Sequence, residues 1–289
     1  MIPVHFDYVA VKDLAEAAKL LKQRRDASIL AGGLSLLTDI KLHRAAPSLL
    51  VDLCKIGALR GISRERAGGD LCIGAMTTYA EIGANQELKE CCPALDDAVA
   101  TLGDQQVRNR GTIGGNLAHN HPAADLPAVA LALEAKVRIA GTEGTRTVPA
   151  DTFFTGPFTT SLAPGEIVTA VDFPAHASGV GSVYEKFKNP ASGYALCGVA
   201  VMIERSDKGT VQNCRVAVVG ASDHVQRLSK VESAMTDKEP TPENIRTAAS
   251  CVTDEQLNFM TDLHASAEYR AHLTAVLTER SLLRAVERW

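Results

Sequence analysis

The chain has 289 residues, of which 46% are hydrophobic and 22% charged, and its net charge is −4. This predicts an ordinary globular protein with a sizeable core and about two domains. The weakly acidic balance excludes the basic surface that nucleic-acid-binding proteins use, so we expect no nucleic-acid partner. Apolar runs stay well short of the ~20 residues that cross a bilayer, and the N-terminus lacks a secretory signal pattern. The sequence therefore predicts a cytoplasmic protein without a transmembrane segment.

The first segment alternates strands and helices. Residues 13–25 place apolar side chains at helical spacing, with Asp13 as the predicted N-cap. Residues 28–31 and 49–53 are short apolar runs typical of buried strands, and a helix is predicted at 36–43 between them. This pattern predicts a small β-α-β unit of roughly fifty residues.

The next segment has an α+β pattern. The predicted elements, in chain order, are a strand at 70–78, a helix at 79–102 interrupted by Pro93, a helix at 123–135, a hairpin at 136–150 and a strand at 166–174.

A domain boundary is predicted at 174–181, where the residues are mostly small and uncharged and include Pro and Gly. Beyond it we expect a strand at 181–188, two strands within 194–220 around a "SDKG" turn, and helices at 241–252 and 265–288. The predicted domains are therefore 1–177 and 178–289.

The seven cysteines argue against a metal or iron–sulfur centre in this chain. Their number is odd, and no C-x-x-C motif occurs. We expect reduced, mostly buried thiols and no bound metal. A redox function would then require an organic cofactor here or a centre on another chain.

The first candidate binding segment is "SILAGGLSLLTDIKLH", residues 28–43. A strand, two glycines and a helix start can bind an anion, because glycine lets a ligand approach the backbone and helix-start N–H groups are unpaired. It is neither a G-x-G-x-x-G fingerprint nor a P-loop. Most single glycine turns are only turns, so this segment alone is weak support for a phosphate site.

A second glycine segment, "RGTIGGNLAHNHPAADLP" at 110–127, strengthens the case. Thr112 and Asn116 supply hydrogen-bonding side chains beside Gly111, Gly114 and Gly115. Asp125 follows at another predicted helix start. Two neutral glycine-rich loops suit a diphosphate, and a nearby carboxylate suits sugar hydroxyls. The two segments together indicate a dinucleotide held without a Rossmann fold.

These motifs resemble those of the flavoprotein (medium) subunit of molybdenum hydroxylases, the xanthine dehydrogenase and carbon monoxide dehydrogenase family. The resemblance covers nearly the whole chain and looks strongest toward the carbon monoxide dehydrogenase type. It includes "FDYV", "AGGLSLL", "LVDL", "IGAMTT", "RGTIGGNLA", "PGEIVTAVDFP", "YEKFK", and "AEYRAHL" with "RAVER" near the C-terminus.

The resemblance implies an α+β fold: a two-lobed, non-Rossmann FAD-binding domain of the vanillyl-alcohol oxidase (PCMH) type, then a small α+β C-terminal domain with a β-sheet and helices. The lobes would span about 1–55 and 56–177. It implies FAD as cofactor and electron transfer to a quinone, NAD or oxygen. The implied partners are a small subunit with [2Fe–2S] clusters and a large subunit with molybdopterin, in a dimer of heterotrimers. The substrate would meet the large subunit, so this chain needs no catalytic residue.

The resemblance also implies the FAD-binding residues. They are Ala31, Gly32, Gly33, Leu34 and Ser35 in the first loop, Gly111, Thr112, Ile113, Gly114, Gly115 and Asn116 in the second, and Gly103, Asp125, Lys186 and Tyr194. Two departures stand out. Leu34 replaces the His or Gln of many relatives, and "NPASG" at 189–193 replaces their charged residues.

Other interpretations stay open at this point. A stand-alone flavin oxidoreductase would need a larger substrate domain and an acid or base aimed at the flavin. A nucleotide-binding regulatory module would bind FAD without being reduced by a partner. His119 and His121 could ligate a metal, although a place in the loop near the adenine side suits them better.

Overall fold

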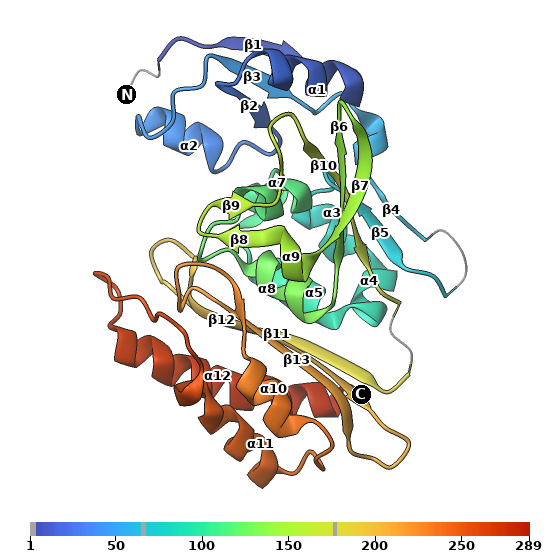
Figure 1. Cartoon of the computed structure of the whole chain (residues 1–289), viewed down its shortest axis with the longest axis vertical. Coiled ribbons are helices and arrows are strands. Elements are labelled where there is room, and N and C mark those ends of the chain that lie inside the picture. The colour runs from blue at the N-terminus through green and yellow to red at the C-terminus, as the bar shows by residue number, and fades with distance from the viewer. Residues whose placement is uncertain (1–3, 65–67, 176–177) are drawn as a thin grey trace.

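The computed structural model describes residues 4–64, 68–175 and 178–289 (Figure 1). The N-terminal lobe is a parallel three-stranded sheet in the order β1-β3-β2 with two helices. Its elements are β1 (Asp7–Ala10), α1 (Leu14–Gln23), β2 (Ala27–Leu30), α2 (Leu36–Lys41) and β3 (Leu49–Asp52). Asp13 caps α1 as predicted, since its carboxylate accepts the Glu16 N–H at 2.8 Å. The predicted β-α-β unit is confirmed, and β1 is an additional strand.

The middle of the molecule is built on an antiparallel sheet in the order β4-β5-β10-β6-β7. Its strands are β4 (Ile62–Arg64), β5 (Leu71–Gly74), β6 (Lys136–Gly141), β7 (Gly144–Pro149) and β10 (Ile167–Phe173); a short 3-10 turn, Gly57–Leu59, precedes β4. The helices are α3 (Tyr79–Ala84), α4 (Gln86–Cys91), α5 (Pro93–Thr101), α6 (Gln105–Arg108), α7 (Ile113–His119), α8 (Asp125–Ala132) and α9 (Ala150–Phe153), and the small hairpin β8 (Phe154–Gly156) and β9 (Thr159–Thr160) follows α9.

Two local predictions need correction here. The segment predicted as one helix at 79–102 forms three helices, because the helix is interrupted at Asn85 as well as before Pro93. Asn85 ends α3 and caps α4 by accepting the Leu88 N–H at 2.9 Å. Much of the predicted second loop is helical, since Ile113 to His119 form α7 with Thr112 as the N-cap.

The C-terminal part is an antiparallel sheet covered by helices (Figure 1). Its elements are β11 (Val180–Lys188), β12 (Ala195–Arg205), β13 (Val211–Val219), β14 (Gln226–Arg227), α10 (Ser229–Met235), α11 (Pro242–Ser250), a 3-10 turn (Cys251–Asp254) and α12 (Ala267–Glu287). The predicted strand pair around "SDKG" is confirmed; α10 was not predicted. The predicted boundary at 174–181 includes residues 176 and 177, which lie outside the described residues.

Strand β12 is buried on both faces, which explains its unbroken apolar sequence. Val199, Val201 and Ile203 belong to the core under α10–α12. Ala200 and Met202 alternate with them and belong to the core shared with the middle sheet. Helices α5 and α8 pack on that second face, so the C-terminal sheet and the middle part share one core. None of the described helices is both long and apolar enough to cross a membrane.

Candidate functional site

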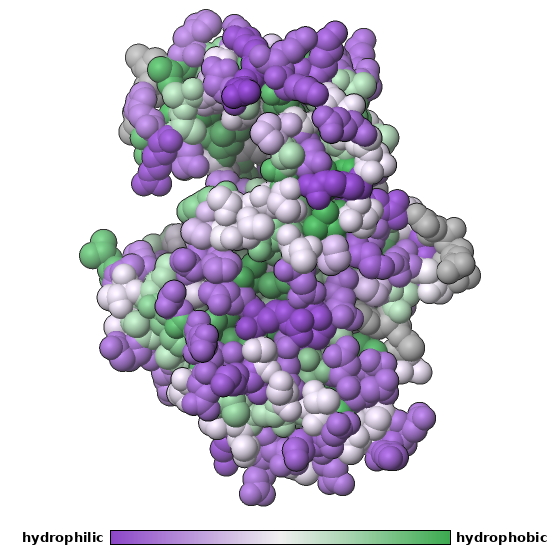
Figure 2. All heavy atoms as spheres, viewed as in Figure 1, coloured by the Kyte–Doolittle hydropathy of each residue, from purple (hydrophilic) through white to green (hydrophobic). Residues whose placement is uncertain are grey.

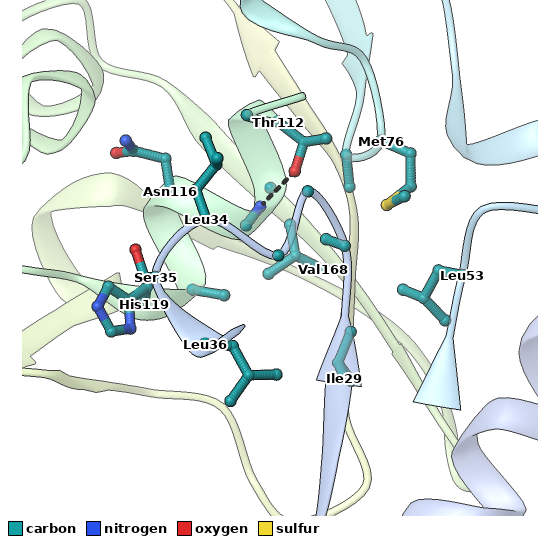
Figure 3. A pocket seen from close by; sticks show the side chains of 18 of the residues that line it. Ile29, Leu34, Ser35, Leu36, Leu53, Met76, Thr112, Asn116, His119 and Val168 are labelled. Carbon is teal, nitrogen blue, oxygen red and sulfur yellow. Dashed lines mark hydrogen bonds between the residues drawn. The ribbon is translucent and has the colours of Figure 1, made fainter. Parts of the chain in front are cut away.

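A cavity of about 410 Å³ lies where the N-terminal lobe meets the middle part of the molecule. Figure 2 shows a hollow at this junction. Both predicted glycine segments line the cavity, together with apolar side chains from Leu53, Met76, Ile167 and Val168. An apolar cleft of this size with a few polar groups is typical of a cofactor site. Figure 3 shows several of the lining side chains.

The first glycine loop, residues 31–35, offers backbone donors to the cavity. Within the described parts of the chain, the N–H groups of residues 32–36 have no acceptor. Ser35 occupies the N-cap position of α2, yet its hydroxyl makes no capping bond. Leu34 lines the cavity as well, and the residue is 39% exposed. This loop can therefore donate several hydrogen bonds to a negatively charged ligand.

Gly32 is required where the two glycine segments touch. A Cβ on Gly32 would lie 2.2 Å from the carbonyl oxygen of Arg110 and 3.1 Å from Cα of Gly111. The two backbones approach each other more closely than any side chain would allow. The contact fixes the distance between the two cavity walls.

The second glycine segment is held by bonds within the protein. The N–H groups of Ile113 and Gly114 donate to the carbonyls of Thr77 and Ala75 at 3.2 and 2.9 Å. The Gly115 N–H donates to the Thr112 hydroxyl oxygen at 3.2 Å, the bond drawn in Figure 3. These N–H groups are therefore not free for a ligand, unlike those of the first loop. What this wall can offer is the Thr112 N–H, which has no acceptor among the described residues, the Thr112 hydroxyl proton and the Asn116 side chain.

Tyr79 is a cavity residue that the sequence pattern did not indicate. It begins α3 and lines the cavity although only 6% of it is exposed. The Asn116 amide Nδ2 donates to the Tyr79 hydroxyl oxygen at 2.9 Å. Gly111 leaves room for the ring, since a Cβ there would lie 2.2 Å from it. Its position inside a predicted helix gave no sequence signal that it faces the site.

Aromatic side chains gather around one end of the cavity. Tyr194, 42% exposed, stacks on His121 with ring centres 4.7 Å apart. Phe158 meets the rings of His121 and His119 edge-on, at 5.1 and 5.5 Å. His119, His121 and Tyr194 line the cavity. Tyr194 thus lies where a planar ring could stack, and Phe158 was not anticipated from the sequence.

Burial keeps His121 neutral. Burial, reinforced by neighbouring His119, lowers the pKa of His121 to about 4. Its Nδ1 accepts the Ala123 N–H at 3.0 Å, so the neutral ring carries its proton on Nε2. The site therefore presents an N–H donor rather than a positive charge at neutral pH.

This pKa predicts an acid-sensitive fold. Because the folded-state pKa lies below the usual value near 6.5, unfolding takes up a proton, and stability falls as the pH drops from about 6.5 to about 4. The variant His121→Asn keeps an acceptor for the Ala123 N–H and should reduce that loss by about 1–2 kcal/mol, because partial exposure screens the shift. Urea unfolding at several pH values measures this. His264→Asn, at an exposed position, is the control; equal pH slopes in wild type and His121→Asn would contradict the prediction.

Lys186 and Asp125 form a buried ion pair that does not line the cavity. The Lys186 side chain is 1% exposed, and its ammonium lies 3.0 Å from Asp125 Oδ2. It also donates to the carbonyls of Thr101 and Gly193 at 3.2 and 3.1 Å. Asp125 accepts a short hydrogen bond from Tyr184. Burial raises the pKa of Asp125, and Lys186 opposes that rise.

This arrangement changes the expected role of Lys186. All three ammonium protons have acceptors in the protein, so the cation has none left for a flavin in this structure. Its bond to Gly193 holds the loop that carries Tyr194. Asn189 closes the same loop, since its Oδ1 accepts the Ala191 N–H at 2.8 Å. Lys186 thus positions the aromatic end of the cavity.

Most, but not all, of the predicted binding residues meet in one place. Those lining the cavity are Ala31, Gly32, Gly33, Leu34, Ser35, Gly111, Thr112, Gly114, Gly115, Asn116 and Tyr194. Four predicted residues lie outside its lining: Gly103, Ile113, Asp125 and Lys186. Ile113 is fully buried in the core, and Gly103 packs against Val107.

The donor set fits a flavin dinucleotide. The unpaired N–H groups of residues 32–36 suit a diphosphate, and the apolar and aromatic walls suit ring systems. Asn116 Oδ1 is buried without a partner, as expected of a group that awaits a ligand.

Comparison with known proteins supports this assignment. Residues 4–176 match the family described as the FAD binding domain in molybdopterin dehydrogenase, and residues 182–285 match the CO dehydrogenase flavoprotein C-terminal domain. The chain is 38% identical to the carbon monoxide dehydrogenase medium chain of Hydrogenophaga pseudoflava, over 98% of this chain and 97% of that one. It is 36% identical to the nicotine 6-hydroxylase medium subunit of Paenarthrobacter nicotinovorans, over 96% of each.

A solved structure of carbon monoxide dehydrogenase from Hydrogenophaga pseudoflava, lacking the Mo-pyranopterin moiety of its cofactor, superimposes with a TM-score of 0.95. The match covers 100% of this chain and 99% of that one at 38% identity. The predicted fold class, an FAD-binding domain followed by an α+β C-terminal domain, is confirmed. The chain belongs to the FAD-binding medium subunits of the molybdenum hydroxylases, the oxidoreductase family that includes the carbon monoxide dehydrogenase flavoproteins.

Proposed function

We propose that this chain is the electron-transfer subunit of a heterotrimeric molybdenum hydroxylase. It receives electrons from [2Fe–2S] clusters of a small partner subunit and passes them to a quinone, NAD or oxygen. A large partner subunit carries molybdopterin and meets the substrate. The complex is a cytoplasmic dimer of heterotrimers. The cavity between two walls of complementary chemistry, one of free N–H donors and one of polar side chains, is the observation that supports this role.

The residues of this chain bind and orient the cofactor. The first glycine loop would hold the diphosphate, and Thr112 and Asn116 would line the opposite wall of the cavity. Tyr194 and His121 would border the ring system, and Lys186 with Asp125 would fix the loop behind Tyr194. FAD, when bound, would supply a centre that can accept electrons one at a time and release them in pairs. No side chain of this chain acts as an acid or base on the substrate.

Purification of the tagged chain from its own host tests the proposal. We expect released FAD by chromatography, one iron–sulfur chain and one larger chain by mass spectrometry, and molybdenum and iron by metal analysis. FAD on a chain that purifies alone would favour a stand-alone flavin oxidoreductase. A complex with both partners and no flavin would contradict the assignment of the two glycine segments.

A further inference from the structure

Two hydrogen-bonding groups remain unused at the wall formed by Tyr79 and Asn116. The amide Nδ2 of Asn116 donates to the Tyr79 hydroxyl oxygen at 2.9 Å. After that bond, the hydroxyl proton of Tyr79 has no acceptor among the described residues, and Asn116 Oδ1 is buried without a partner. Buried polar groups are rarely left in this state unless a ligand or water completes them.

The pair is held firmly in place. The Tyr79 backbone N–H donates to the Gly111 carbonyl at 3.0 Å, and the ring fills the space that a side chain on Gly111 would need. Thr78 caps α3 in a reciprocal capping box with Glu81. Asn116 is fixed on α7, where its N–H donates to the Thr112 carbonyl at 3.0 Å. The two polar groups therefore have a defined position before any ligand binds.

The chemistry of the pair selects its ligand. Burial raises the pKa of Tyr79 far above neutrality, so its hydroxyl always carries a proton to donate. Asn116 Oδ1 can only accept. A phosphate at neutral pH has acceptors alone, so it could satisfy Tyr79 but would repel Oδ1. A hydroxyl group donates and accepts at once, and it can satisfy both.

We propose that Tyr79 and Asn116 together recognise one sugar hydroxyl of the bound dinucleotide. The proposal rests on the FAD-carrying role given above. Both residues lie on the wall facing the first glycine loop, whose free N–H groups suit the diphosphate. In FAD, sugar hydroxyls flank the diphosphate on both sides, on the ribityl chain and on the adenosine ribose.

The test removes the hydrogen bond from the protein and from the ligand in turn. The complex is isolated with wild-type chain or with Tyr79→Phe, its flavin is removed, and the affinity for each added ligand is measured. The ligands are FAD and FAD analogues that each lack one ribityl or ribose hydroxyl. We expect Tyr79→Phe to bind FAD about tenfold more weakly. One deoxy analogue should bind wild type about tenfold more weakly than FAD does. The same analogue and FAD should bind Tyr79→Phe with equal affinity. The hydroxyl that this analogue lacks shows whether the pair recognises the ribityl chain or the adenosine ribose.

Two results would overturn the assignment. One is that Tyr79→Phe binds FAD with the same affinity as wild type. The other is that Tyr79→Phe weakens the binding of FAD and of every deoxy analogue by the same factor. If Tyr79→Phe does not fold, wild type alone decides, because uniform affinity for all analogues rejects hydroxyl recognition. Tyr8→Phe is the matched control, since its hydroxyl bonds Asp52 at 2.6 Å in the N-terminal lobe and Tyr8 does not line the cavity. Failure of wild type to bind any FAD would instead refute the proposed function.

Discussion

Replacing Gly32 with alanine should weaken FAD binding by at least about 100-fold. The new Cβ would lie 2.2 Å from the Arg110 carbonyl oxygen, so the first glycine loop must move away from the second segment. That movement displaces several N–H donors at once, and losing two hydrogen bonds to a charged group costs about 3 kcal/mol or more. The strain should also lower the free energy of unfolding by about 1–3 kcal/mol.

Flavin fluorescence titration of the deflavinated complex and urea unfolding measure the two effects. Gly57→Ala is the matched control, because a Cβ at Gly57 meets nothing within 4 Å. Wild-type affinity in Gly32→Ala would show that the close approach of the two backbones does not shape the site. A loss of stability without a loss of affinity would separate the packing role of Gly32 from binding.

Replacing Lys186 with methionine should destabilise the fold by about 3–5 kcal/mol. The change leaves the carboxylate of Asp125 buried without its cation, and such an uncompensated charge is far more costly than the loss of a surface pair. The carbonyls of Thr101 and Gly193 also lose their donor. We expect the loop that carries Tyr194 to become more mobile as a result.

A double variant separates the buried charge from the lost packing. Adding Asp125→Asn to Lys186→Met removes the unpaired charge and should restore about half or more of the lost stability, measured by urea unfolding. Lys188→Met changes an exposed lysine two residues away and should be nearly neutral. If Lys186→Met costs less than about 1 kcal/mol, or if the double variant shows no recovery, the ion pair does not stabilise this fold.

Local sequence patterns located most elements of the fold. The apolar runs at β3, β10 and β12 predicted strands because these strands are buried on one or both faces, and the run at β2 did so although that strand is only half-buried. The short helices were harder to place. The break at Asn85 depends on one side-chain cap, and α6 spans four residues, which is too short for a periodic pattern. Strand β1 begins with exposed residues, so its sequence carries little apolar signal.

The part of the site that the backbone of glycine residues forms was predictable from the sequence. The glycines at 32, 33, 111, 114 and 115 indicate both walls of the cavity from local sequence alone. The roles of individual groups were not predictable, because they depend on distant partners. Lys186 reaches Thr101 and Asp125 across more than sixty residues of sequence, and Asn116 meets Tyr79 across thirty-seven. A local pattern carries no information on such contacts.

The difference between the two glycine walls has a consequence for how each wall would hold the cofactor. In the second wall the N–H groups of residues 113–115 are engaged with residues 77, 75 and 112, while the side chains of Tyr79 and Asn116 keep groups for a ligand. The first loop still has N–H groups of residues 32–36 to satisfy. A bound cofactor would therefore take backbone donors from the first loop and mainly side-chain groups from the second wall.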